Sequence, residues 1–465
     1  MARLTSISEH ARALREGKTT SRALLENCLE AALDPSGEGA RVFTAIDVEA
    51  ARRAADAVDQ QRKKNTPSGP LAGIPISVKD LFDVAGEVTT AGSKALADAP
   101  PAIRDATAIA RLRSAGAILA GRNNMSEFAY SGLGLNPHYG TPRNPFDRAT
   151  GRVPGGSSSG SAVAVADGIS VASIGTDTGG SVRIPAALCG VTGYKPTANR
   201  VPLDGVLPLS PTLDSVGPIA PTVDCCIRLD SVLSGSDCQA PVPSSLGDLR
   251  IGILQGYVLD DLDSTVSQRF ENAILLLSQA GANVMDVQFP SLSKIPEVNA
   301  KGGLIAYEVY AWHCALIEKH GAEYDPRVLV RIMRGKEITS HEHSELLETR
   351  KTIISEADRV FSDFDIWILP TVPRIAPPIA EVAASDAAYF AANGAMLRNP
   401  GVVNFLDGCA LSIPCHRPGD PPVGLTLFAP HGQDEKLLAV GLAAEAVLSK
   451  AGCAISTVEI SARSY

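Results

Sequence analysis

The sequence contains two glycine- and serine-rich stretches, P-G-G-S-S-S-G-S at Pro154–Ser161 and G-T-D-T-G-G-S-V-R-I-P at Gly175–Pro185. The residues between them are mainly apolar and predict a helix followed by a strand. Glycine lets the backbone approach a ligand closely, because a Cβ atom would block both the approach and a positive φ. The pattern therefore predicts two tight turns joined by a helix and a strand, with several backbone N–H groups of the second turn directed toward one point.

The same alternation of apolar runs and amphipathic helices extends outward in both directions. Helices are expected at 6–15, 20–33, 47–64, 106–114, 266–280 and 435–450, and strands at 74–78, 117–120, 169–174, 251–254, 284–289, 366–369, 411–414 and 424–428. This alternation is typical of an α/β fold, with a mixed, mostly parallel β-sheet covered by helices on both faces.

The chain has 465 residues and shows neither an internal repeat nor a long polar linker, so it is expected to form a single large domain over 1–465. Within it we expect a helical N-terminal layer at 1–65 and a catalytic core at 66–230. The helical segment at 290–362 is either a cap over a site or an exposed layer, and the sequence leaves both open.

Composition limits the partners and the compartment. The net charge is −9 without runs of like charge, which argues against nucleic acid and membrane and favours a small-molecule substrate. Nine cysteines without a C-x-x-C pair indicate reduced thiols and a cytoplasmic protein. The first fifteen residues lack the apolar core of a signal peptide, and no later run of about 18 apolar residues predicts a membrane span.

Ser181 lies in the second glycine-rich turn and is a candidate nucleophile for acyl transfer, with nearby backbone N–H groups stabilising an oxyanion. A serine needs a base, and none of the eight histidines can be assigned to that role from sequence. A buried, neutral lysine is the alternative, and Lys79 ends an apolar strand. The alternative is a purely structural role for Lys79, in an ion pair with Asp80. That pairing is geometrically awkward, because neighbouring side chains of a strand point to opposite faces.

These residues resemble those of the amidase signature family. The resemblance rests on the two stretches above, on G-I-P-I-S-V-K-D at Gly73–Asp80 and on C-G-V-T-G-Y-K-P-T at Cys189–Thr197, and it extends loosely over nearly the whole chain. It implies the amidase signature fold, and cleavage of a small or aryl carboxamide to a carboxylic acid and ammonia or an amine through an acyl-enzyme.

The resemblance also implies roles for individual residues. Ser181 would be the nucleophile, Ser157 the bridging serine after a cis peptide bond from Gly156, and Lys79 the base that takes the proton through Ser157. The oxyanion hole would consist of the N–H groups of Thr178, Gly179, Gly180 and Ser181.

Other residues near these motifs are given structural roles or left open. Asp177 and Arg183 are expected to hold the shape of the loop around the nucleophile, and Ser158, Ser159 and Ser161 to satisfy backbone groups. Met125, Phe128 and Tyr130 fall in a segment that runs near the acyl pocket in related enzymes, with core packing as the alternative.

Two other functions remain as alternatives. One is the glutaminase component of a tRNA-dependent amidotransferase, which works only in a complex, but Ile184 stands where those proteins typically have glutamine. The other is a catalytically silent binding protein on the same fold. We expect no cofactor and no metal, because the sequence shows neither a metal-ligand cluster nor a phosphate loop. The sequence leaves the oligomeric state open, and homodimers are common in the family.

Overall fold

One β-sheet organises the molecule. The computed structural model describes residues 4–66, 69–236 and 246–453, so both ends of the predicted domain fall outside the described residues. Within them, the sheet has 11 strands in the order β1-β3-β2-β4-β6-β5-β10-β11-β9-β7-β8. The strands are β1 Phe43–Ala45, β2 Pro75–Lys79, β3 Ile118–Asn123, β4 Ala172–Thr176, β5 Thr192–Lys195, β6 Val216–Ala220, β7 Arg250–Leu254, β8 Asn283–Val287, β9 Ile366–Pro370, β10 Cys409–Pro414 and β11 Gly424–Ala429.

The sheet is mixed, as predicted, but it is not mostly parallel. Its parallel pairings are β2 with β3 and β4, and β7 with β8 and β9. Every pairing from β4 through β6, β5, β10 and β11 to β9 is antiparallel, and so is β1 with β3. The sequence pattern missed β1, β5 and β6 because they are short, and because Pro218 inside β6 is typical of a loop.

The described helices lie before, between and after these strands in the sequence. They are α1 Ile7–Arg15, α2 Ser21–Leu33, α3 Gly39–Val42, α4 Val48–Lys63, α5 Thr107–Ser114, α6 Ser159–Ala166, α7 Arg183–Cys189, α8 Val223–Ser234, α9 Ser264–Gln279, α10 Lys294–Val298, α11 Gly303–His320, α12 Pro326–Met333, α13 Ser340–Phe361, α14 Ile379–Ala383, α15 Asp386–Arg398, α16 Pro400–Phe405 and α17 Asp434–Lys450. All six predicted helices form, within two residues of the expected ends. None of the described helices is long and apolar enough to cross a membrane.

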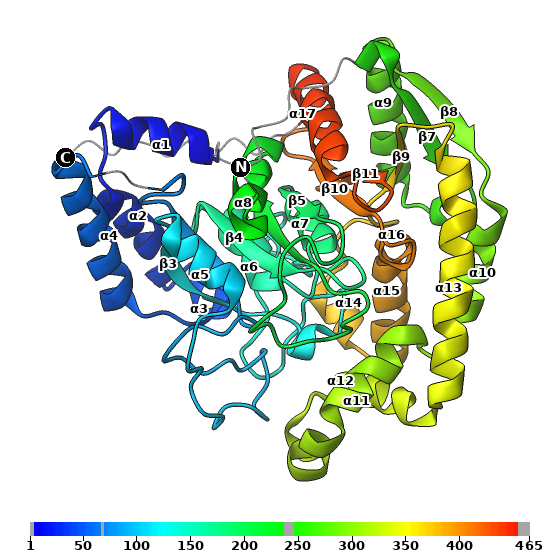
Figure 1. Ribbon diagram of the computed structural model, residues 1–465, viewed down its shortest axis with the longest axis horizontal. Helices are drawn as coiled ribbons and strands as arrows, with labels where there is room; N and C mark the ends of the chain where they lie inside the picture. Colours follow the sequence, from blue (N-terminus) through cyan, green and yellow to red (C-terminus); the bar gives the residue numbers. More distant parts are fainter. Residues whose placement is uncertain (1–3, 67–68, 237–245, 454–465) are drawn as a thin grey trace.

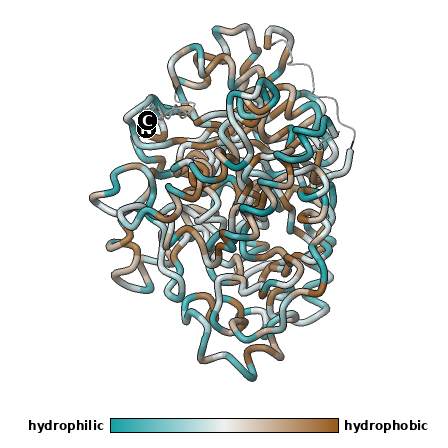
Figure 2. The backbone as a smooth tube through the Cα atoms, turned by 90° about the vertical axis from the view of Figure 1, so that its left-hand side faces the viewer, coloured by the Kyte–Doolittle hydropathy of each residue, from teal (hydrophilic) through white to brown (hydrophobic). Residues whose placement is uncertain are grey.

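Both faces of the sheet are covered, and β9 shows how. Ile366 and Ile368 join the apolar cluster that includes residues of α8, α9 and α17. The alternate residues Trp367 and Leu369 join a different cluster, with residues of α13 and α16. Successive side chains of a strand point to opposite faces, so the two clusters are the two sides of the sheet. The apolar segments accordingly gather inside the molecule (Figure 2).

Different parts of the sequence supply the helices at the two ends of the sheet. The N-terminal helices α1, α2 and α4 lie on one side of the molecule, and α13 runs along the other (Figure 1). Helices α11 and α12 project at the lower end of that view, next to α14 and α15. Within the segment 290–362, α10 and α13 therefore pack in the apolar cluster that includes residues of β7, β8 and β9, whereas α11 and α12 pack against Leu209 and residues between 81 and 130.

Leu411 tests the contribution of the core between β10 and α17. Its side chain is fully buried, so Leu411→Ala should lower the free energy of unfolding by about 2–5 kcal/mol through lost burial and a residual cavity. Ile103 is 96% exposed, and Ile103→Ala should change the same quantity by less than about 0.5 kcal/mol. Urea denaturation of the three proteins measures this, and equal midpoints would contradict the assigned packing.

Candidate active site

Lys79 lies at the centre of a small polar cluster at the carboxyl end of β2. Strand β4 runs parallel to β2, with Val78 paired to Ile174, so the ends of the two strands lie side by side. The Nζ atom of Lys79 is 2.6 Å from Ser157 Oγ and 2.8 Å from Thr176 Oγ1. All three side chains are at most 3% exposed. The lysine thus has two hydroxyl partners and no carboxylate in hydrogen-bond contact among the described residues.

The surroundings of Lys79 favour its neutral form. Burial lowers the pKa of Lys79 to about 7, although the carboxylates of Asp214 and Asp177 act in the opposite direction. Asp80 is not a partner, because its carboxylate pairs with Arg122 at 2.8 Å. The two neighbours on the strand therefore point into separate environments, as their alternation predicted.

Ser157 is held in place by its backbone. The Gly156–Ser157 peptide bond is cis, as the resemblance implied. Gly156 must be glycine, because a Cβ atom there would lie 2.5 Å from the backbone nitrogen of Gly134. Ser158 Oγ and Ser159 Oγ donate to the backbone carbonyls of Thr176 and Asn124, as predicted. Ser161 Oγ instead donates to a side chain, at Asn123 Oδ1.

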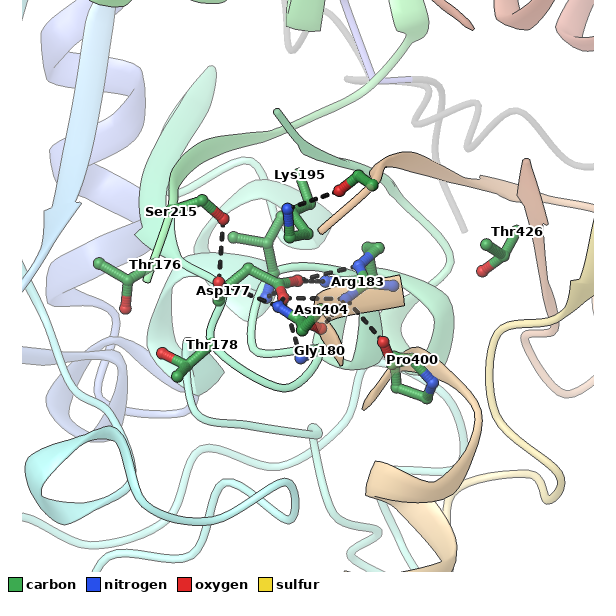
Figure 3. Close-up of polar contacts among 12 residues, drawn as sticks. Thr176, Asp177, Thr178, Gly180, Arg183, Lys195, Ser215, Pro400, Asn404 and Thr426 are labelled. Atoms are coloured by element: carbon green, nitrogen blue, oxygen red, sulfur yellow. Dashed lines mark hydrogen bonds and ion pairs between the residues drawn. The ribbon is translucent and has the colours of Figure 1, made fainter. Parts of the chain in front are cut away.

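The loop that carries Ser181 is organised around the buried carboxylate of Asp177. This carboxylate accepts hydrogen bonds from the N–H groups of Gly180 and Val182, at 2.9 and 3.1 Å. Arg183 binds it through two nitrogens, at 3.0 and 2.9 Å (Figure 3). Asp177 and Arg183 therefore hold the shape of the loop, as expected, through an ion pair around which the loop turns.

The same network ties the loop to the C-terminal part of the chain. Arg183 also donates to the carbonyl of Pro400 and to Asn404 Oδ1, and Asn404 Nδ2 donates to Asp177 (Figure 3). Burial alone would raise the pKa of Asp177, but Arg183, Lys195 and Asn404 outweigh it and the pKa falls. Asp177 therefore stays ionised, and its charge compensates that of Arg183.

The backbone N–H groups of the loop differ in whether they already donate a hydrogen bond. The N–H of Gly180 is already bonded to Asp177. Within the described part of the chain, the N–H groups of Thr178, Gly179 and Ser181 donate no hydrogen bond. Of the four N–H groups named from the resemblance, three are thus free to meet a ligand.

Ser181 lies next to the Ser157 turn. The N–H of Ser158 donates to the carbonyl of Ser181 at 3.2 Å, which joins the two loops through their backbones. The Oγ atom of Ser181 makes no hydrogen bond to a described residue, and no described histidine bonds to Ser157 or Ser181. Lys79 is thus the basic side chain that the described structure places in contact with Ser157.

A cavity of about 470 Å³ opens beside the loop and is lined by Thr178 and Gly179. Tyr130, one of the three residues expected near the pocket, also lines it. Met125 and Phe128 do not: both are fully buried in an apolar cluster, which is the packing alternative. The other walls come from 295–305 and 331–334 in the segment 290–362, and from residues 394–405.

The sequence did not single out two residues of this site. Thr176 belongs to the glycine-rich stretch and ends the strand beside β2, so strand pairing would have revealed it. Asp214 lies in a proline-rich loop without a motif. Its Oδ1 accepts a hydrogen bond from Thr178 Oγ1 at 2.5 Å, and burial raises the pKa of Asp214 to about 6.

Comparisons with known proteins show to which family the chain belongs. The family model described as Amidase matches residues 29–438. The chain is 34% identical to 2-amino-5-chloromuconic acid deaminase of Comamonas testosteroni, over 96% of both chains. It is also 34% identical to the A-type subunit of the glutamyl-tRNA(Gln) amidotransferase of Chloroflexus aggregans, over 94% of this chain and 95% of that one.

A solved structure described as an amidase superimposes with a TM-score of 0.85 at 34% identity, covering 97% of this chain and all of that one. These matches span the four stretches that carry the resemblance and the whole sheet, so the likeness is not confined to the loops around Ser181. The chain belongs to the amidase family of amide-hydrolysing enzymes, as the resemblance of its motifs predicted.

Proposed function

We propose that the protein hydrolyses the C–N bond of a small or aryl carboxamide through an acyl-enzyme on Ser181. The observation that carries this proposal is the contact of 2.6 Å between the buried Lys79 Nζ and Ser157 Oγ, beside a loop with three unengaged N–H groups. A base, a hydroxyl relay and an oxyanion site are the parts that serine-based acyl transfer requires.

Acylation begins with attack of Ser181 Oγ on the amide carbonyl carbon. The proton of Ser181 passes to Ser157 Oγ, whose own proton passes to the neutral amine of Lys79. The oxyanion of the tetrahedral intermediate accepts hydrogen bonds from the N–H groups of Thr178, Gly179 and Ser181. We leave Gly180 out of this set, because its N–H donates to Asp177.

The C–N bond then breaks, and the leaving nitrogen takes the proton back from Lys79 through Ser157. Ammonia or an amine departs, and the acyl group remains as an ester on Ser181. Water attacks this ester by the same proton route, which releases the carboxylic acid and restores the serine. Every group that these steps need is a residue of the chain.

Replacement of the nucleophile tests the covalent step. Ser181→Ala should reduce amide turnover by roughly 10⁴-fold or more, because the acyl-enzyme can no longer form. Ammonia release measures turnover, and intact-protein mass spectrometry measures the adduct left by a fluorophosphonate. Ser362→Ala, at an exposed position, is the control and should retain both. A fluorophosphonate adduct of undiminished yield in Ser181→Ala would show that another residue is the nucleophile.

The pH dependence of fluorophosphonate labelling tests whether Lys79 is the base. Lys79 acts only when neutral, and its neutral fraction grows as the pH rises through its pKa of about 7. The rate of fluorophosphonate labelling should therefore increase through about pH 7 and then level off. Lys79→Ala should remove this limb and lower the rate by about 10²–10⁴-fold. The exposed-site variant Lys64→Ala should keep the wild-type profile, and a profile shared by Lys79→Ala and the wild type would rule out Lys79 as the base.

Substitution of Asp214 tests the direction in which its charge shifts the pKa of Lys79. Its negative charge raises the pKa of Lys79, so Asp214→Asn should lower that pKa and move the limb of the labelling profile to lower pH. The asparagine Oδ1 could still accept the N–H groups of Leu209 and Ser210, which now bond to Asp214 Oδ2. A limb that moved to higher pH in Asp214→Asn would contradict the assigned electrostatics.

The amidotransferase component named among the relatives suggests the alternative of a glutaminase. Ile184 is fully buried and packs with Leu133 and Leu188 in an apolar cluster, so it offers no polar group to a glutamine substrate. We therefore favour hydrolysis by the chain alone. Ammonia release from simple amides by the purified chain supports this, and activity that appeared only with glutamine and partner proteins would favour the alternative.

A further inference from the structure

The cavity beside Thr178 and Gly179 contains three arginines. Arg331 lies in the last turn of α12, Arg334 begins the following 3₁₀ turn Arg334–Glu337, and Arg398 ends α15. Arg331 and Arg334 are three residues apart on one continuous helical path, a spacing that places side chains on the same face. Among the described lining residues there is no aspartate and no glutamate.

The partners of these arginines are neutral. Arg331 donates to the carbonyl of Tyr130 and its guanidinium lies 3.9 Å from the centre of the Tyr130 ring. Arg398 donates to Asn399 Oδ1 at 3.0 Å and weakly to the carbonyl of Val258. The guanidinium of Arg334 donates no hydrogen bond to a described residue. These contacts orient two of the guanidinium groups without neutralising any of them.

Arg327, a neighbour of these arginines, differs from them. It lies one helical turn before Arg331 on the same helix, and its guanidinium pairs with Asp386 at 2.8 Å. The buried arginines near the catalytic residues are also paired, Arg122 with Asp80 and Arg183 with Asp177. Within the described residues, none of the three cavity arginines forms an ion pair, although Asp260 and Asp261 act on Arg398 from a distance.

Three arginines without an ion-pair partner lie around one cavity, and their positive charges repel each other. This concentration of positive charge occurs in a protein whose net charge is −9. Burial opposes the charge of Arg398 further, because it lowers the pKa of that guanidinium. Such a concentration of one sign in a concave site attracts ligands of the opposite sign. Guanidinium groups in particular match the two oxygens of a carboxylate.

We infer that the cavity selects amide substrates that carry a carboxylate on the acyl part, which Arg331, Arg334 and Arg398 bind while the amide carbonyl meets the N–H groups of Thr178 and Gly179. This inference rests on the proposed function and narrows its substrate class to half-amides of dicarboxylic acids. The three arginines then determine specificity, and Lys79, Ser157 and Ser181 keep the chemistry.

The first experiment compares matched substrates on the wild-type enzyme. Succinamate, glutaramate and adipamate each have a neutral counterpart in their diamide, with kcat/KM corrected for the second amide group. For the acid of the right length, the half-amide should be preferred by about tenfold or more, since a hydrogen-bonded charge pair is involved. The preference should shrink as sodium chloride is added. Diamides hydrolysed as well as, or better than, every half-amide would overturn the inference.

The second experiment removes the cations one at a time. Arg331→Met, Arg334→Met and Arg398→Met should each reduce the ratio of kcat/KM for the half-amide to that for the diamide by several-fold. Arg327→Met, the matched control from the same helix, should leave this ratio and the basal activity unchanged. Arg334 is exposed, so its substitution is the least disruptive of the three to folding. A ratio that no cavity variant alters would overturn the inference.

A binding measurement separates this inference from the proposed function. Isothermal titration of the Ser181→Ala protein with each half-amide and its diamide reports recognition without turnover. Preferred binding of the half-amide, lost in Ser181→Ala/Arg334→Met, supports the arginine site even if the wild type hydrolyses no amide. Turnover of diamides with no preference for a carboxylate in either assay would support the proposed function and refute the arginine site.

Discussion

The burial of an amine without a carboxylate in contact is the constraint on which the rest of the described structure depends. Lys79 is fully buried, and its hydrogen-bond partners are the hydroxyl groups of Ser157 and Thr176. Lys79 stays without a carboxylate partner because the adjacent Asp80 pairs with another residue. That residue is Arg122, on the neighbouring strand β3. The parallel pairing of β2 with β3 and β4 thus separates the charge pair from the amine and brings the hydroxyl group of Thr176 to it.

A second buried charge, that of Asp177, holds the other half of the site. It gathers the N–H groups of its own loop and pairs with Arg183, and Asn404 on α16 joins both residues. Removing one member of such a network leaves an uncompensated charge in the interior, which costs several kcal/mol. The loop around Ser181 is therefore fixed by residues more than 200 positions apart in the sequence.

The sequence was sufficient to predict what local chemistry determines. The amphipathic helices, the apolar strands and the four quoted stretches indicated the fold class, the family and the environment of Lys79. They did not reveal β5 and β6, whose pairing depends on neighbours far along the chain, and so the expectation of a mostly parallel sheet was wrong. Asp214 and the cavity arginines lie outside any motif, and only the packing of loops and helices brings them to the site. Phe128 looked like a pocket residue for the opposite reason, because an aromatic residue near a motif has the same pattern in a core and in a pocket wall.

The origin of the cavity walls has a consequence for how such an enzyme diversifies. The residues of the proposed proton route and oxyanion loop lie between 79 and 181, whereas most of the residues that line the cavity lie between 295 and 405. Substitutions in the later region would therefore change the shape and charge of the cavity while leaving Lys79, Ser157 and Ser181 in place. Substrate preference and chemistry are separable in the sequence of this chain.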